Sequence, residues 1–255
     1  MDEFKLSGQE VYQILKKKGV RYMHHSNTVA TSITFIQNRA LLTRHFVESE
    51  GLYQTPQKSD PEDKKFDVWD SVFLDGEDLH NRYSRANKYG PVLFKFKLEL
   101  LVSPSIKEVY ITKTNPWYWK NTTSLENKYY KSTVDLNRDY LTGRSLDSQI
   151  MFTVRSPGTE IKLNKFLHSI VLDIPKLLIK TRSREEMLVG DYGFKAIQNT
   201  LSSHGLGHVP LIKRHDGRLA LCRCITEYNY LHSFNKQELK KRFAMADIPP
   251  DCASL

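Results

Sequence analysis

Cysteine is scarce in this chain, and its scarcity excludes proteins that are held together by disulfide bonds. The 255 residues contain only Cys222, Cys224 and Cys252, which are too few and too unevenly spaced for a disulfide framework. A Cys-x-Cys pair with one distant cysteine is also not a zinc-binding pattern. We therefore expect reduced thiols in a cytoplasmic protein.

Long apolar runs are missing as well. No run approaches the roughly 20 residues that a membrane-spanning helix needs. The first residues, MDEFKLSGQE, lack the basic start and the apolar centre of a signal peptide. We therefore expect no membrane partner.

Basic residues are in excess, with a formal net charge of +9 at pH 7 and an isoelectric point near 9.3. Lys and Arg gain affinity for polyanions because they release phosphate counterions, so DNA or RNA is a reasonable partner. Residues 117–140 interleave basic side chains with six aromatic ones. These fit either base stacking or packing of an irregular segment onto the core; they are Trp117, Tyr118, Trp119, Tyr129, Tyr130 and Tyr140.

The most informative stretch is residues 20–44. A β-branched and aromatic run leads into His24, His25, Ser26 and Asn27, and apolar residues then recur at helical spacing. Asn27 is a suitable N-cap for this helix. The strand would place the imidazoles, and the free N–H groups at the helix start favour an anion such as a pyrophosphate. The pattern predicts a site for a polar ligand.

Other segments predict further elements. Residues 4–18 predict an amphipathic helix that is capped by Ser7, and residues 48–67 predict a long loop. Residues 68–101 predict a strand, a polar helix and a second strand, with His80 and Tyr83 on one face of the helix.

The second half of the chain changes character near residue 176. Residues 146–174 predict three strands, with a short helical crossing at 164–167. Residues 176–255 are basic and predict helices and turns, with a frayed tail from about residue 241.

Three separated segments resemble one family in order. The first is Met23-His24-His25-Ser26, followed by a helix and Ala40-Leu41-Leu42. The second is Phe73-Leu74-Asp75, then Tyr83, then a strand over 92–101. The third is a strand that opens at Gln149. Over residues 20–174 the chain resembles the ADP-ribosyltransferases, in the branch of diphtheria toxin and the poly(ADP-ribose) polymerases, whose triad is His, Tyr and Glu.

The resemblance implies an α+β fold with a split mixed β-sheet. Residues 1–175 would form the catalytic domain, and residues 176–255 a basic helical extension packed on it. NAD would be the substrate, and the bond between nicotinamide and ribose would break with oxocarbenium character. The residues implied to bind NAD are His24, His25, Ser26, Asn27, Arg44, His80 and Tyr83.

The resemblance also implies roles in catalysis. His24 would bond ribose hydroxyls, Ser26 the nicotinamide amide, and Tyr83 would stack on the nicotinamide ring. Gln149 stands where the family has its glutamate, and an amide supplies no negative charge to a cation-like transition state. Three readings follow: Asp147 supplies the carboxylate, the chain is an inactivated form of an enzyme with Glu at 149, or it binds NAD without turnover.

The acceptor stays open. Resemblance to DarT-like toxins, together with the basic charge, favours mono-ADP-ribosylation of DNA or RNA by a bacterial toxin or antiphage effector with an antitoxin partner. Modification of a protein is a second reading. A metal-dependent nuclease built on Asp147, Glu160 and Lys162 is a third, because Asp followed by Glu-x-Lys can hold a divalent ion and a water nucleophile. A non-catalytic nucleic-acid-binding protein is the fourth.

Overall fold

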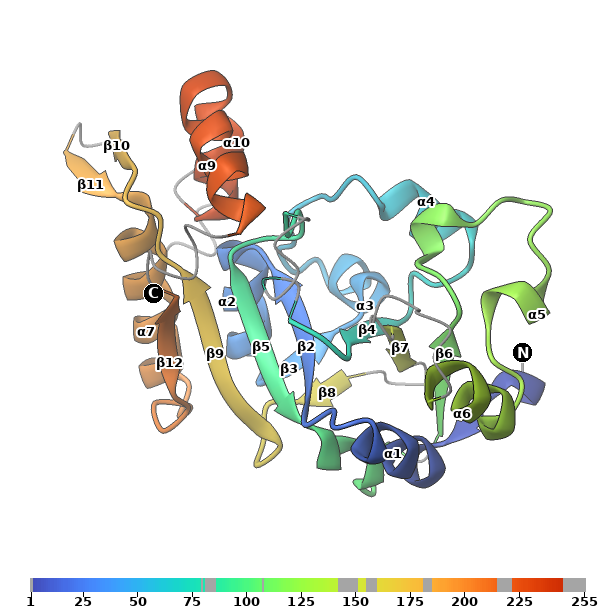
Figure 1. Ribbon diagram of the computed structural model, residues 1–255. Coiled ribbons are helices and arrows are strands. Elements are labelled where there is room, and N and C mark those ends of the chain that lie inside the picture. The colour runs from blue at the N-terminus through green and yellow to red at the C-terminus, as the bar shows by residue number, and fades with distance from the viewer. Residues whose placement is uncertain are drawn as a thin grey trace.

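The computed structural model describes residues 2–78, 80, 86–106, 108–141, 151–154, 160–180, 185–214 and 222–244. Its centre is an eight-stranded mixed sheet, in which all neighbours are antiparallel except the last pair (Figure 1). The strand order is β1 (Leu6–Ser7), β6 (Glu108–Thr112), β7 (Met151–Val154), β4 (Val72–Asp75), β2 (Tyr22–Asn27), β5 (Val92–Lys97), β9 (Leu167–Asp173) and β12 (Leu211–Arg214). Together with the helices, this sheet confirms an α+β fold.

Short elements complete the described fold. Two small sheets pair β3 (Ala40–Leu42) with β8 (Glu160–Lys162), and β10 (Leu178–Lys180) with β11 (Glu186–Leu188). The helices are η1 (Asp2–Phe4), α1 (Gly8–Lys17), α2 (Val29–Gln37), α3 (Arg44–Ser49), α4 (Asp60–Lys65), η3 (Leu98–Val102), η4 (Pro116–Tyr118), α5 (Leu125–Lys128), α6 (Thr133–Leu141), α7 (Val189–Ser203), α9 (Arg223–Phe234) and α10 (Lys236–Arg242). Among the described residues, no helix combines the length and the apolar character that crossing a bilayer requires.

One face of the β2–β5–β9 region carries the core. Because side chains alternate along a strand, Met23, Phe94 and Ile170 point the same way, and each is fully buried. Helices α2 and α7 pack together over this region. Gly193 of α7 allows the close approach, since a Cβ there would lie 3.1 Å from Val29 and 3.2 Å from Phe243.

The opposite face of the same strands is polar. Tyr22 and His24 of β2 lie opposite Lys97 and Lys95 of β5. The Lys95 ammonium lies 3.9 Å from the centre of the Tyr22 ring, a cation–π contact. On this face the two lysines of β5 therefore lie beside His24, the first of the predicted histidines.

Strands β2 and β4 are joined by one residue pair only. His24 pairs with Asp75, whereas β2 pairs with β5 along its whole length, Tyr22–Asn27. Past His24 the side chain of His25 bridges the two strands, with its Nδ1 2.8 Å from the Phe73 carbonyl oxygen. The sheet is thus divided beside β2, although a single pair keeps it continuous.

The cap at Ser7 is confirmed, but the first helix covers Gly8–Lys17 and not the predicted 4–18, since Asp2–Phe4 forms η1 and Leu6–Ser7 forms β1. Ser7 caps α1 by accepting a hydrogen bond from the Glu10 N–H at 3.4 Å. The expected N-cap at Asn27 is wrong by one residue, because Asn27 ends β2 and Thr28 caps α2. The Asn27 Oδ1 accepts from the Thr28 N–H, and the Thr28 hydroxyl accepts from the Thr31 N–H. The chain's own oxygens therefore already occupy part of the predicted anion site.

Three predicted segments, one loop and two helices, need correction. The expected loop over 48–67 contains α4, which starts with Pro61 in its first turn and with acidic residues that suit a helix N-terminus. The described residues of 76–90 form no α-helix. The helical crossing at 164–167 is a turn, closed by a hydrogen bond from the Leu167 N–H to the Asn164 carbonyl.

The C-terminal part is not only helical. It supplies β12, which extends the main sheet parallel to β9, and the β10–β11 hairpin. The predicted frayed tail is wrong for its first residues, since Phe243 is fully buried against Tyr228. Residues 245–255 lie outside the described residues, and the boundary near 175 stays a prediction.

Candidate functional site

A pocket lies where β2 and β4 separate. Its cavity volume is about 120 Å³ and it is partly open to solvent. It is therefore smaller than the roughly 300–1,000 Å³ typical of small-molecule sites, and a dinucleotide would have to extend out of it or widen it. Both strands line it, together with side chains from the start of α3 and from the segment around α4. The predicted NAD-binding residues in its wall are His24, His25, Ser26, Asn27 and Arg44.

The two histidines are neutral and lie on opposite faces of β2, His24 on the polar face and His25 against Phe35 and Phe94 on the core face. Burial lowers the pKa of both His24 and His25 to about 4. Each Nδ1 lies within hydrogen-bond distance of a carbonyl oxygen, of Asp75 at 3.2 Å and of Phe73 at 2.8 Å. Since a carbonyl can only accept, each Nδ1 carries the proton and each Nε2 presents a lone pair.

Several polar atoms in the pocket wall have no partner. The buried atoms His25 Nε2, Arg44 Nε and Ser71 Oγ belong to lining residues and make no hydrogen bond to any residue that the structure describes. A buried polar atom left without a partner costs about 1–3 kcal/mol. Solvent hardly reaches these atoms, so a ligand would contact them only if the wall opened, and they do not by themselves mark a binding site.

Carboxylates are also part of the wall, namely Asp63, Asp75 and Glu77. Burial raises the pKa of Asp63 to about 6. The Arg44 guanidinium is held elsewhere, with its Nη2 2.7 Å from Asp60 Oδ2. The pocket can therefore supply negative charge to a cationic group, and a proton-transfer group that titrates near neutral pH.

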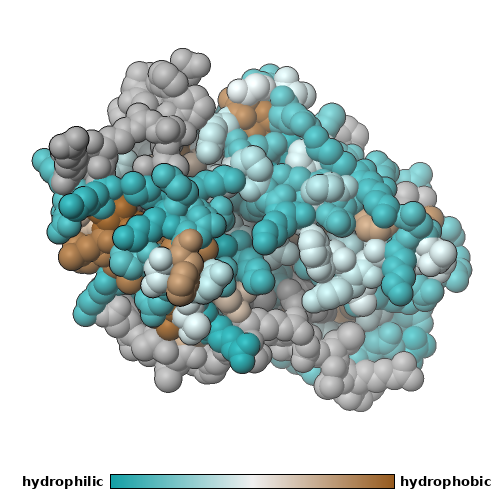
Figure 2. Space-filling view, turned by 90° about the horizontal axis from the view of Figure 1, so that it is seen from above, coloured by the Kyte–Doolittle hydropathy of each residue, from teal (hydrophilic) through white to brown (hydrophobic). Residues whose placement is uncertain are grey.

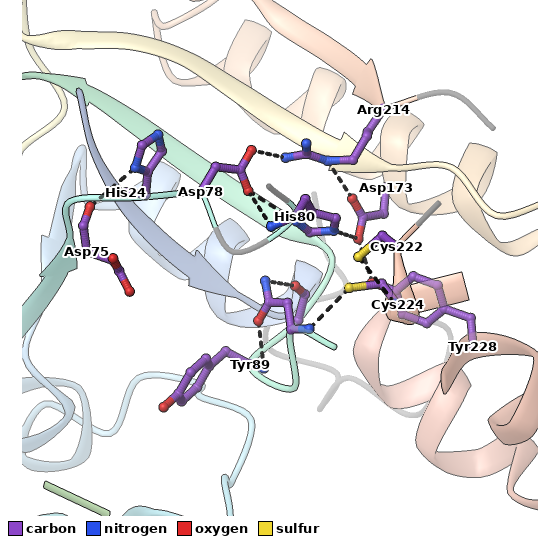
Figure 3. A network of polar contacts seen from close by, with 12 residues as sticks. His24, Asp75, Asp78, His80, Tyr89, Asp173, Arg214, Cys222, Cys224 and Tyr228 are labelled. Atoms are coloured by element: carbon purple, nitrogen blue, oxygen red, sulfur yellow. Dashed lines mark hydrogen bonds and ion pairs between the residues drawn. The ribbon is translucent and has the colours of Figure 1, made fainter. Parts of the chain in front are cut away.

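His80 lies outside this pocket, contrary to its predicted role in NAD binding. Its Nδ1 lies 3.2 Å from Asp78, and its Nε2 2.9 Å from Asp173 (Figure 3). Burial alone would lower the pKa of His80, but these carboxylates raise it to about 12. Arg214 bonds the same two carboxylates at 2.8 and 3.0 Å. His80 is thus part of a separate buried charge network.

The predicted residues Tyr83, Asp147 and Gln149 lie outside the described residues, so the expected triad is not placed. The strands of the three motifs are nevertheless neighbours. His24 of β2 pairs with Asp75 of β4, and Asp75 pairs with Met151 of β7. Segments that are far apart in sequence thus meet beside the pocket.

The other sequence candidates fare differently. Glu160 and Lys162 of β8 form an ion pair with each other and do not line the pocket. Most of the aromatic segment packs inward, since Trp119, Tyr129, Tyr130 and Tyr140 are at most 5 % exposed. Trp117 and Tyr118 alone in this set are open to solvent, at 49 % and 67 %. Packing therefore explains four of the six aromatic residues.

Sequence reasoning missed several wall residues. Asp63 and Ser59 fall in the segment that was expected to be a loop without regular structure, and Trp69 and Ser71 fall in the run expected to be a strand. No sequence signal separates them from ordinary polar residues, since only the fold brings them beside β2.

Comparison with known proteins adds no relative. The chain matches no protein-family model, and no curated protein is significantly similar to it.

Proposed function

We propose that this chain is a mono-ADP-ribosyltransferase that transfers ADP-ribose from NAD to DNA or RNA. One observation carries the proposal. The three strands that resemble the family's motifs, β2, β4 and β7, are consecutive in the sheet, and the histidine strand opens into a single pocket. The ADP-ribosyltransferase-like split core is part of this proposal.

The wall of the pocket suits NAD. The Nε2 of His24 would accept a hydrogen bond from a ribose hydroxyl, and the Nε2 of His25 one from the nicotinamide amide. Ser26 would complete the amide contacts, and Arg44 offers an unused Nε–H to a phosphate oxygen. In the reaction the bond between the nicotinamide nitrogen and ribose C1 breaks, and nicotinamide leaves with the bonding pair. The acceptor atom then bonds C1 and loses a proton.

The carboxylates in the wall could replace the glutamate that the family has where this chain has Gln149. Cleavage leaves positive charge on the ribose, and a nearby carboxylate stabilises it. Asp63 and Asp75 could supply that charge in place of an ionised group at position 149. This is a fourth explanation for the glutamine at position 149. The other three are that Asp147 supplies the carboxylate, that the chain is an inactivated enzyme, and that it binds NAD without turnover.

A nucleic-acid acceptor suits the polar face of the sheet. Lys95 is the direct cross-strand partner of His24, and Lys97 follows along the same face. Lys16, Arg21 and Lys97 line a groove at the far end of this face. Phosphates bound there would lead a strand toward the pocket. The surface in Figure 2 is largely hydrophilic, with small separate apolar areas, which fits a charged rather than an apolar partner.

The test is to incubate the purified chain with NAD and a DNA or RNA oligonucleotide, with and without magnesium, and to measure the mass of the oligonucleotide. A gain equal to ADP-ribose supports transfer. Magnesium-dependent shortening would instead favour the nuclease reading. NAD binding without a mass gain would support the NAD site but contradict transfer to the oligonucleotide.

Variants sharpen this test. His24→Ala should weaken NAD binding by about tenfold, the equivalent of one lost hydrogen bond to a buried group. His45→Ala is the matched control, because His45 is exposed on α3 and does not line the pocket. Equal binding by wild type and both variants would contradict the assignment of the pocket. Gln149→Glu should raise NAD consumption if the chain is a disabled enzyme, and Asp147→Ala should lower it if Asp147 carries the charge.

A further inference from the structure

A second candidate site lies in the buried network at the C-terminal end of β9, where Asp173 bonds His80 and Arg214. The ligand atoms of His80, Cys222 and Cys224 all lie within 4.8 Å of one another, and the three residues are buried (Figure 3). The two cysteines sit at the start of α9, where the Cys222 Sγ caps the helix by accepting from the Cys224 N–H at 3.4 Å. The fold therefore brings a Cys-x-Cys pair to a histidine that is far away in sequence.

The surroundings of these atoms resemble the outer shell of a metal site. The Asn87 N–H donates to the Cys224 Sγ at 3.1 Å, and N–H···S bonds of this kind stabilise a thiolate. The Nδ1 of His80 faces Asp78, an arrangement that orients a metal-binding imidazole through its other nitrogen. That other nitrogen, Nε2, lies on the side of the ring toward Cys222.

A fourth ligand is close at hand. Asp173 Oδ2 lies 2.9 Å from His80 Nε2, and its neighbours Arg214 and Tyr228 already hold the carboxylate in place. Two thiolates, an imidazole and a carboxylate form a ligand set that suits tetrahedral Zn²⁺.

We propose that His80, Cys222 and Cys224 bind one Zn²⁺ ion, with Asp173 or water in the fourth position. Binding exchanges the ion for three protons, one from the His80 imidazolium and one from each thiol, so that no other reactant is needed. The ion takes the place of the proton between His80 and Asp173.

Such an ion would act as a clamp between distant segments. It would join the start of α9 to the segment around His80, and that segment continues to Asn87 and to Tyr89 in the pocket wall. The zinc site thus stabilises one side of the NAD pocket but does not depend on NAD chemistry. The zinc proposal can therefore be tested whether or not the chain is a transferase.

The experiment is to remove metal from the full chain with a chelator, titrate it with Co²⁺, and record the visible and near-ultraviolet spectrum. Two thiolates in a tetrahedral site should give intense d–d bands together with a sulfur-to-cobalt charge-transfer band, at one ion per chain. Added Zn²⁺ should abolish both. Elemental analysis of the untreated protein should find one zinc per chain.

Matched variants locate the ion. Cys222→Ser or Cys224→Ser should reduce the charge-transfer band to half or less, because one of the two thiolates is lost, whereas Cys252→Ser should retain it in full. Asp78→Asn should weaken zinc affinity by about 10- to 100-fold, as outer-shell changes do. Circular dichroism distinguishes a folded variant from an unfolded one. A folded wild-type chain without a cobalt spectrum would overturn the proposal and leave a metal-free charge network. So would a folded Cys224→Ser chain that keeps the full intensity of the charge-transfer band.

Discussion

Replacing Asp63 by Asn should stabilise the protein, and more strongly at high pH than at low pH. The pKa of Asp63 is raised by burial from 3.8 to about 6. Asp60 and Glu62 add to this effect, while Ser59 and Arg44 oppose it. Because the folded state prefers the protonated carboxyl, ionisation costs stability. The cost is absent well below pH 3.8, grows between pH 3.8 and about 6, and is complete above that range.

The magnitude follows from how far burial raises the pKa of this carboxyl. A pKa that differs by one between the folded and unfolded states corresponds to about 1.4 kcal/mol. Ionisation of Asp63 therefore lowers the free energy of unfolding by about 3 kcal/mol at pH 8 and by about 1 kcal/mol at pH 4.5. Asn keeps the size of the side chain and cannot ionise. Asp63→Asn should therefore raise the free energy of unfolding by about 2 kcal/mol more at pH 8 than at pH 4.5.

Urea unfolding of the wild type and the variant at both pH values measures this difference. Glu50→Gln is the control, because Glu50 is an exposed carboxyl at the end of α3. Its effect should be small and equal at both pH values. A difference between wild type and Asp63→Asn that is independent of pH, or larger at pH 4.5, would refute the reasoning about Asp63.

Three further outcomes are expected. Affinity for NAD should rise as pH increases through about 6, because the ionised Asp63 attracts the cationic nicotinamide ring; isothermal titration at pH 5 and pH 8 measures this, and a flat profile contradicts it. Lys95→Glu should weaken oligonucleotide binding and reduce its salt dependence, whereas Lys236→Glu on the exposed part of α10 should change both much less. Arg214→Ala should destabilise the fold by about 3 kcal/mol, the lower end for a broken buried ion pair, because His80 still bonds Asp78 and Asp173 when the guanidinium is lost. Lys213→Ala removes only a partly exposed ion pair and should cost at most about 1 kcal/mol. Urea unfolding of both variants measures these costs.

Local patterns predicted the fold best where the signal is contained in a few residues. Ser7 and Glu10 mark the start of α1, and Gly19, with a φ of +84°, follows its end. The alternation along β5 correctly places Phe94 and Phe96 in the core. The run of polar residues after Met23 also identified one wall of the pocket, because those residues are consecutive on one strand.

Contacts between distant segments were beyond the reach of these patterns. Cys222 and Cys224 do not form a zinc motif in sequence, and only the docking of α9 brings them to His80. His80 was predicted to share a helix face with Tyr83 at the NAD site, yet carboxylates on both sides of its ring hold it in another network. The pairing of β12 with β9 likewise depends on α7 returning the chain to the sheet.

The single backbone pair between His24 and Asp75 affects how easily the sheet can open beside β2. Most neighbouring strands are coupled by a ladder of hydrogen bonds, which resists bending about the line between them. Here the backbones of the two half-sheets are paired at one position, and the side chains of His24 and His25 add hydrogen bonds to Asp75 and Phe73. The proposed dinucleotide would need to break only these few contacts to separate the half-sheets, and each half would keep its own ladder.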